Sequence, residues 1–212
     1  MKEIKVKDLK AAARKSLDIL EFSSKNKTNM SIALTGGNFG EEFTKLLAKS
    51  SFKDSCLSIF QTDERFVCNQ NDDSIQKKIY EHFQGNDLKS YDLIFFDTSV
   101  SFEDCFLKLK RKVDTLQLSR FDFTLLSLGE DGHLAGHFEN SISCFNDLFC
   151  FTSDSPKPPK ERVSFNIQWL LKSEIIILAG VGGSKERALK RFKKGEGLHS
   201  SLRFHPNLYL LT

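Results

Sequence analysis

A histidine next to an acidic residue gives the sequence its clearest candidate for catalysis. The stretch SLGEDGHLAGHF, residues 127 to 138, places His133 two positions after Asp131. Gly132 between them allows the chain to turn sharply. A carboxylate beside an imidazole fixes its tautomer and raises its basicity, which suits general-base catalysis near neutral pH. We therefore take His133 and Asp131 as a candidate base and its orienting acid.

A second histidine in the same stretch raises the possibility of a metal site. His137 follows His133 by four residues, the spacing of the two histidines in zinc proteases. Those enzymes carry Glu directly after the first histidine, whereas this chain has Leu134, and Gly136 weakens a helix here. No third cluster of ligands is visible in the sequence. We expect no metal, and a structural or rim position for His137.

Two glycine-rich stretches could bind an anion. Thr35-Gly36-Gly37-Asn38 precedes a predicted helix, so its backbone N–H groups could hold a phosphate, or it could simply be a tight turn. It matches neither the Walker pattern nor GxGxxG. In GVGGSK, Ser184 could cap the next helix, which would put Lys185 in the first helical turn. A cation in the first turn interacts unfavourably with the helix dipole, so Lys185 is better stabilised there if an anion binds at the same site.

Two arginines have both a structural and a functional interpretation. In QTDERF, Asp63 or Glu64 could form a surface ion pair with Arg65, or Arg65 could face an anionic or carbonyl oxygen of a ligand. Arg162 stands where a proline-rich loop meets a short predicted strand. It could face solvent, or it could be a second phosphate ligand beside Lys185.

Alternating strands and helices must position these residues. Apolar runs at 31–35, 57–61, 92–96, 123–128 and 174–180 are typical of strands buried on both faces of a parallel sheet. Helical patterns occupy 7–23, 41–50, 73–83, 101–116 and 184–192, with Asp73 and Ser101 as predicted N-caps. In such sheets ligands bind beyond the carboxyl ends of the strands. The candidate residues follow strands, so we expect them in one crevice.

Composition narrows the class of protein. The 212 residues suit one domain, 1–212, and the proline-rich stretch 153–161 reads as a loop and not a linker. With 31 basic and 28 acidic residues, the net charge of +3 does not indicate a nucleic-acid partner. No apolar run is long enough to span a membrane. Five cysteines without a CxxC pair, and no signal-peptide pattern, favour a cytoplasmic protein.

An ordered set of motifs resembles a known family. LTGG, DERFV, DDS, FDFTLLSLGEDGHLAGHF, PKPPKERVSF and GSK occur in the order found in 6-phosphogluconolactonases, across about residues 8 to 192. Glucosamine-6-phosphate isomerase/deaminase belongs to the same wider group. The resemblance implies a three-layer α/β sandwich with a mainly parallel, Rossmann-like sheet, and no cofactor or metal. It also implies hydrolysis of 6-phospho-D-glucono-1,5-lactone in the oxidative pentose phosphate pathway.

The resemblance assigns roles to residues of this chain. It implies that His133 takes a proton from water, that Asp131 orients His133, and that Arg65 lies near the reacting end or the substrate oxygens. The residues that it implies for substrate or phosphate binding are Gly36, Gly37, Asn38, Asp63, Arg162 and Lys185. The expected partner is a small sugar-phosphate lactone, and we expect a monomer or weak homo-oligomer.

Some positions depart from the family pattern. TGGNFG replaces the usual SGGSTP, so that Phe39 stands for a hydroxyl ligand and Gly40 for a proline; Ile75 replaces an asparagine. These changes leave open a weakened or altered substrate preference. Two alternatives follow. One is an amino-sugar-phosphate deaminase/isomerase, which typically has DEY where this chain has Arg65. The other is a non-catalytic sugar-phosphate-binding protein.

Overall fold

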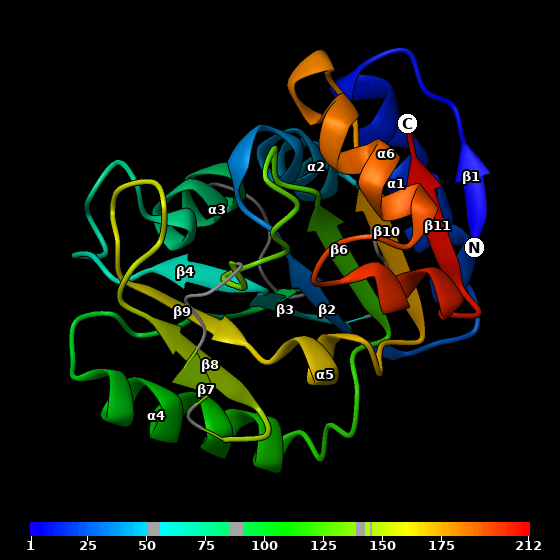
Figure 1. Cartoon of the computed structure of the whole chain (residues 1–212). Coiled ribbons are helices and arrows are strands. Elements are labelled where there is room, and N and C mark those ends of the chain that lie inside the picture. Colours follow the sequence, from blue (N-terminus) through cyan, green and yellow to red (C-terminus); the bar gives the residue numbers. More distant parts are fainter. Residues whose placement is uncertain (51–55, 85–90, 139–142, 145) are drawn as a thin grey trace.

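A seven-stranded parallel sheet forms the centre of the protein (Figure 1). The computed structural model describes residues 1–50, 56–84, 91–138, 143–144 and 146–212. The strand order is β1-β11-β10-β6-β2-β3-β5, and every neighbouring pair runs parallel. The strands are β1 (Lys2–Ile4), β2 (Asn29–Leu34), β3 (Cys56–Gln61), β5 (Tyr91–Ile94), β6 (Phe123–Ser127), β10 (Ile175–Ala179) and β11 (Leu208–Leu211).

The strand order reverses direction between β2 and β6. From β2 the chain builds outward through β3 to β5, and from β6 it builds the other way through β10 to β11. Such a reversal opens a crevice at the carboxyl ends of the two central strands. The five predicted strands are all confirmed. The edge strands β1 and β11 were not predicted, because three and four residues are too few to show a pattern.

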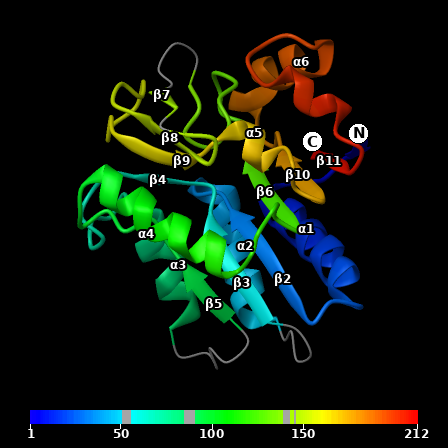
Figure 2. The same ribbon diagram turned by 90° about the horizontal axis from the view of Figure 1, so that it is seen from below.

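Three helices cover one face of the sheet (Figures 1 and 2). They are α1 (Leu9–Ser24), α2 (Gly37–Lys49) and α3 (Ile75–Phe83). Their buried side chains form one apolar cluster with the sheet, in which Phe43 stacks on Phe123 with ring centroids 6.1 Å apart. Helix α2 begins at Gly37, four residues before the predicted start, so its first turn directly follows the glycine loop. No helix in the described ranges is both long and apolar enough to cross a bilayer.

The other face carries helices and a small second sheet. The helices are α4 (Phe102–Thr115), the short α5 (Ile167–Leu170) and α6 (Glu186–Lys194), with a 3-10 helix at Ser200–Phe204. The second sheet is antiparallel, in the order β4-β9-β8-β7. The sequence predicted one of its strands, the short strand that begins at Arg162, but not the sheet. Its strands are β4 (Asp63–Arg65), β7 (Ser143–Cys144), β8 (Phe149–Thr152) and β9 (Arg162–Phe165).

Phenylalanine fills the space between this second sheet and its neighbours. Phe106 of α4 stacks on Phe149 of β8 with ring centroids 5.0 Å apart and planes 6° apart. Phe165 of β9 meets both Phe149 and Phe121, with centroid distances of 5.2 and 5.1 Å. Close ring pairs of this kind add to the stabilisation from burial alone. The abundance of Phe therefore serves the core, which holds β9 firmly against the central sheet.

The observed N-caps confirm one prediction and correct another. The Ser101 hydroxyl accepts a hydrogen bond from the N–H of Asp104 at 3.2 Å, as predicted for the start of α4. For α3 the cap is Ser74, whose hydroxyl accepts from the N–H of Lys77 at 3.2 Å, so the prediction of Asp73 is wrong by one residue.

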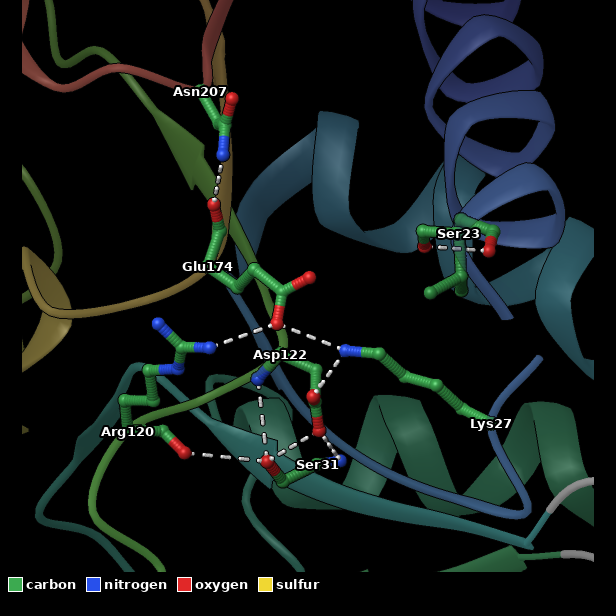
Figure 3. Close-up of polar contacts among 8 residues, drawn as sticks. Ser23, Lys27, Ser31, Arg120, Asp122, Glu174 and Asn207 are labelled. Carbon is green, nitrogen blue, oxygen red and sulfur yellow. Dashed lines mark hydrogen bonds and ion pairs between the residues drawn. The ribbon is translucent and has the colours of Figure 1, made fainter. Parts of the chain in front are cut away.

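An ion-pair network ties together the amino ends of the central strands (Figure 3). Lys27 donates from Nζ to Asp122 at 2.6 Å and to Glu174 at 3.0 Å, and Arg120 also reaches Glu174 at 3.1 Å. Asp122 accepts from the N–H of Ser31 at 2.8 Å. Burial alone would lower the pKa of Lys27, but its two carboxylate partners outweigh burial and raise it. The network joins the starts of β2, β6 and β10.

Candidate active site

A cavity of about 210 Å³ lies at the carboxyl ends of β2, β6 and β10, where the strand order reverses. We call it the switch-point cavity. It brings together most of the residues selected from the sequence, although they follow different strands. Its lining includes Gly36, Gly37, Asp63, Arg65, His133, Lys157 and Lys185.

His133 is oriented by Asp131 through two hydrogen bonds. The ring Nδ1 lies 2.5 Å from Asp131 Oδ1, and the backbone N–H of His133 donates to the same oxygen at 3.1 Å. A carboxylate can only accept here, so Nδ1 carries the hydrogen and Nε2 keeps its lone pair. Burial would raise the pKa of Asp131, but the hydrogen bonds and charge of His133 hold it below its usual value. His133 is thus set up to accept a proton at Nε2.

Two neighbours fix the place of the His133 ring. Gly132 has φ +97°, so the chain turns sharply between acid and base as predicted. Gly129 donates its N–H to the carbonyl of His133 at 2.9 Å. A Cβ on Gly129 would lie 2.1 Å from His133 Nδ1, so only glycine leaves room for the ring. Gly129 is therefore a site residue whose role the sequence did not reveal.

Lys185 is a half-buried cation beside the same cavity. Its Nζ donates to the Ser127 hydroxyl at 2.6 Å. Burial lowers its pKa, and the charge of Glu130 offsets this only in part. No carboxylate of the described residues forms an ion pair with Lys185. A partly desolvated ammonium without a close counter-charge is a suitable partner for an anion.

The turn that carries Lys185 differs from the prediction. A 3-10 turn, Gly183–Lys185, precedes α6, and Lys185 occupies the N-cap position of α6. No side chain caps α6, so Ser184 is not the cap that the sequence predicted. Lys185 reaches the cavity from this turn and does not stand in the first turn of the helix.

The N-terminus of α2 opens toward the cavity. Gly36 is its N-cap residue and provides no side-chain hydrogen bond, and Gly37 has φ +71°. The first N–H groups of α2 therefore have no side-chain cap, as an anion site requires. Gly40 is needed for close packing, since a Cβ there would lie 1.8 Å from the carbonyl oxygen of Thr35. Asn38 is exposed and lines a neighbouring groove, outside the switch-point cavity.

Arg65 reaches the cavity from β4. Its Nη1 donates to the carbonyl of Asp73 at 2.7 Å, and no carboxylate among the described residues forms an ion pair with it. The alternative of a surface ion pair with Asp63 or Glu64 is therefore wrong. Asp63 is buried and accepts from the Thr62 hydroxyl at 2.8 Å.

Glu64 has a positioning role that the sequence did not reveal. Its carboxylate is fully buried and accepts from the N–H groups of Arg65, Ile75 and Gln76 at 2.7, 2.8 and 2.6 Å. The side chains of Gln61 and Ser74 also donate to it, at 2.7 and 3.2 Å. Burial raises the pKa of Glu64 although these donors act in the opposite direction. Glu64 thus joins Arg65 to the start of α3.

Arg162 lies next to Arg65 on the neighbouring strand. The two residues are paired in the β4–β9 ladder. Arg162 is buried, so it is not solvent-facing, and it is not among the residues that line the cavity with Lys185. Its Nη2 donates to the carbonyl of Lys157 at 3.2 Å, while Nη1 has no partner among the described residues. Burial, and then the charge of Arg65, lower its pKa.

His137 has a structural position, as expected. It is 1% exposed, and its Nε2 donates to the carbonyl of Phe165 at 2.8 Å. The chain between the two histidines is a turn in which Ala135 has φ +50°, so no helix aligns them. Within the described part of the chain, no group of three or more His, Cys, Asp or Glu side chains could hold a metal.

Lys157 and Glu130 also line the cavity, from the proline-rich loop and the loop after β6. They pair with each other at 3.3 Å, both largely exposed. The sequence predicted a proline-rich loop here, but no motif marked Lys157. Lys157 is thus a third cation around the cavity, in addition to Arg65 and Lys185.

Comparisons with known proteins agree on one family. Residues 6–203 match the family described as glucosamine-6-phosphate isomerases/6-phosphogluconolactonase. The 6-phosphogluconolactonase of Borreliella burgdorferi is 27% identical over 199 residues, covering 86% of this chain and 83% of that protein. The chloroplastic 6-phosphogluconolactonase 3 of Arabidopsis thaliana is 28% identical, but the match covers only 62% of its length and 87% of this chain.

A solved structure has the same fold over nearly the whole chain. The crystal structure of 6-phosphogluconolactonase from Thermotoga maritima superposes with a TM-score of 0.87, covering 99% of this chain and 97% of that one. At 24% identity this likeness concerns the fold. The sequence match extends through every cluster that lines the switch-point cavity. The chain therefore belongs to the glucosamine-6-phosphate isomerase/6-phosphogluconolactonase family.

Proposed function

We propose that this protein hydrolyses 6-phospho-D-glucono-1,5-lactone to 6-phospho-D-gluconate. The observation that carries the proposal is the meeting of two functions in one small cavity. His133, held by Asp131, lines this cavity with no hydrogen bond to its Nε2 among the described residues, and Lys185, Arg65 and the N-terminus of α2 surround the same space. A general base and an anion site are what a phosphorylated lactone needs, because its ester bond is already activated.

The proposed reaction uses water and one proton relay. Water attacks the carbonyl carbon of the lactone while His133 Nε2 takes a proton from it. Asp131 stabilises the imidazolium that forms, through the Nδ1–H bond. The bond between the carbonyl carbon and the ring oxygen then breaks, and His133 returns its proton to that oxygen. The products are a carboxylic acid and an open-chain hydroxyl group.

Cationic groups would act on both ends of the substrate. We assign the phosphate to Lys185 and to the N–H groups at Gly36 and Gly37. Arg65 would face the oxygen on which charge develops during attack, because charge that is stabilised mainly in the transition state speeds the reaction. Arg162 would reinforce the positive potential from behind Arg65.

The remaining predictions concern substrate contacts and setting. We propose that Asp63 binds a substrate hydroxyl, and we keep Asn38 as a candidate only for the outer edge of the phosphate site.

The names of the relatives and the presence of Arg65 favour the lactonase over the deaminase/isomerase. We also propose a single domain over 1–212, acting as a monomer or weak homo-oligomer in the cytoplasm. The free thiols of Cys56, Cys68 and Cys105 support a reducing compartment.

The experiment that tests the proposal generates the lactone in situ with glucose-6-phosphate dehydrogenase and follows its decay with and without the protein. We expect the wild type to accelerate decay, and His133→Ala to lower kcat by more than tenfold, which is the scale of removing a general base. His82→Ala is the control, since His82 lies on α3 and outside the switch-point cavity. Equal rates for His133→Ala and wild type would reject the role of His133.

A further inference from the structure

A second and larger cavity shares His133 with the switch-point cavity. It has a volume of about 480 Å³, and His133 is a lining residue of both cavities. Its walls come from the loop after β6, the proline-rich loop, α6 and the segment that follows α6. A substrate whose carbonyl group meets His133 from the switch-point cavity would therefore have this second space next to it.

His199 lines the second cavity and has a ring nitrogen that can accept a hydrogen bond. The side chain lines this cavity although the residue is only 6% exposed. Its Nε2 lies 3.3 Å from the carbonyl oxygen of His137, and a carbonyl only accepts, so Nε2 carries the hydrogen. Nδ1 then has a lone pair. It forms no hydrogen bond among the described residues and is not one of their fully buried unpaired atoms, so it keeps some accessible surface. Burial is the main cause that lowers the pKa of His199 to about 4, so the ring is neutral near pH 7.

The rest of the lining suits an uncharged ring better than an ion. Apolar side chains, among them the buried Phe138 and Phe192, form part of the wall. The charged lining residues have both signs: Lys160 is paired to Asp154 at 3.2 Å, and Arg191 and Glu196 also line the cavity. An apolar wall with one fixed acceptor matches a sugar ring, which offers C–H surfaces and hydroxyl donors.

We propose that the second cavity receives the hydroxylated edge of the substrate ring, and that His199 Nδ1 accepts a hydrogen bond from one ring hydroxyl. This inference rests on the proposed function and deepens it. The phosphate and the hydroxyl assigned to Asp63 would lie in the switch-point cavity, the carbonyl group at His133, and the other ring hydroxyls beyond it. His199 would then determine specificity, because it contacts a part of the substrate that does not react.

Kinetics of three variants test the proposal. His199→Phe keeps the ring volume and removes the acceptor, and we expect it to raise KM about tenfold with kcat within twofold of wild type, as the loss of one hydrogen bond would. His199→Asn puts a carbonyl oxygen near the position of Nδ1 and should recover part of the loss. The matched control is His205→Phe. His205 also donates to a backbone carbonyl, at 2.9 Å, but its Nδ1 already accepts from the N–H of Asn207 at 3.3 Å.

The kinetic outcomes separate this inference from the proposed function. If the wild type does not accelerate lactone decay, the proposed function fails. If the wild type is active and His199→Phe has the same KM, only the role of His199 is refuted. A fall in kcat at constant KM would also overturn it, because His199 would then act on the reacting centre.

A measurement on the wild type keeps the proposal testable if His199→Phe does not fold. The protein with ¹⁵N-labelled histidine is titrated with the product, 6-phosphogluconate, near pH 7. We expect the unprotonated Nδ1 resonance of His199 to move to lower frequency as it accepts a hydrogen bond, while inorganic phosphate alone leaves it unchanged. An unchanged resonance at saturating 6-phosphogluconate would refute the proposal.

Discussion

Replacing Gly129 by alanine should displace the catalytic base without unfolding the protein. The added Cβ would lie 2.1 Å from His133 Nδ1 and 2.7 Å from Asp131 Oδ1, whereas ordinary contact begins at 3.4 Å. The ring must therefore move by roughly 3.4 − 2.1, or about 1.3 Å. A misplacement of about 1 Å in a catalytic geometry costs on the order of a hundredfold in rate. We expect Gly129→Ala to lower kcat for the lactone about a hundredfold.

The assay for this variant is again the decay of lactone generated in situ, followed over a range of lactone concentrations. Gly183→Ala is the matched control, since a Cβ there meets nothing within 4 Å and should leave the rate within about twofold. Because Asp131 and His133 are partly exposed and can yield, we expect the melting temperature of Gly129→Ala to stay close to that of wild type. Full activity in folded Gly129→Ala would show that the ring position is not required for catalysis.

Three further substitutions probe the phosphate site and the supports of the fold. Lys185→Ala should raise KM more than tenfold with little change in kcat, because the phosphate is remote from the reacting carbonyl; loss of kcat alone in steady-state kinetics would contradict that placement. Glu64→Ala should lower the free energy of unfolding in urea by at least about 3 kcal/mol, because it leaves several buried donors without an acceptor; a change below about 1 kcal/mol would argue against its bridging role. Asp122→Ala should lower the free energy of unfolding in urea by about 2 kcal/mol, because Lys27 and the N–H of Ser31 lose a charged partner. Lactone turnover should stay unchanged, because Asp122 is far from the site. A loss of turnover in the folded variant would contradict this separation.

The sequence predicts the central strands because their burial leaves a continuous apolar signal. Strands such as β2 and β10 are covered on both faces, and their composition shows it directly. Strands β4 and β7 of the antiparallel sheet give no comparable signal. Strand β4 has the charged sequence Asp-Glu-Arg, and β7 has only two residues. These strands form because pairing with β9 and β8 in the folded protein stabilises them. The residue pattern within each strand does not indicate such pairing.

Site residues were predictable where their roles depend on near neighbours. Asp131 and His133 interact across one turn, so their spacing carried the information. The role of Glu64 depends on N–H groups of a helix that begins eleven residues later, at Ile75. The position of Arg162 depends on pairing with Arg65 across the antiparallel sheet. Such long-range partners leave no mark in local sequence, and neither does the acceptor of His199.

The ion-pair network around Lys27 lies at the amino edge of the sheet (Figure 3), whereas the residues with proposed chemistry lie past its carboxyl edge. Substitutions in one region therefore need not trade off against the other, a conflict common in enzymes whose stabilising and reactive groups are intermixed. Substitutions meant to raise thermal stability should therefore start around Asp122 and Glu174. Substitutions meant to change substrate preference should start at the carboxyl edge.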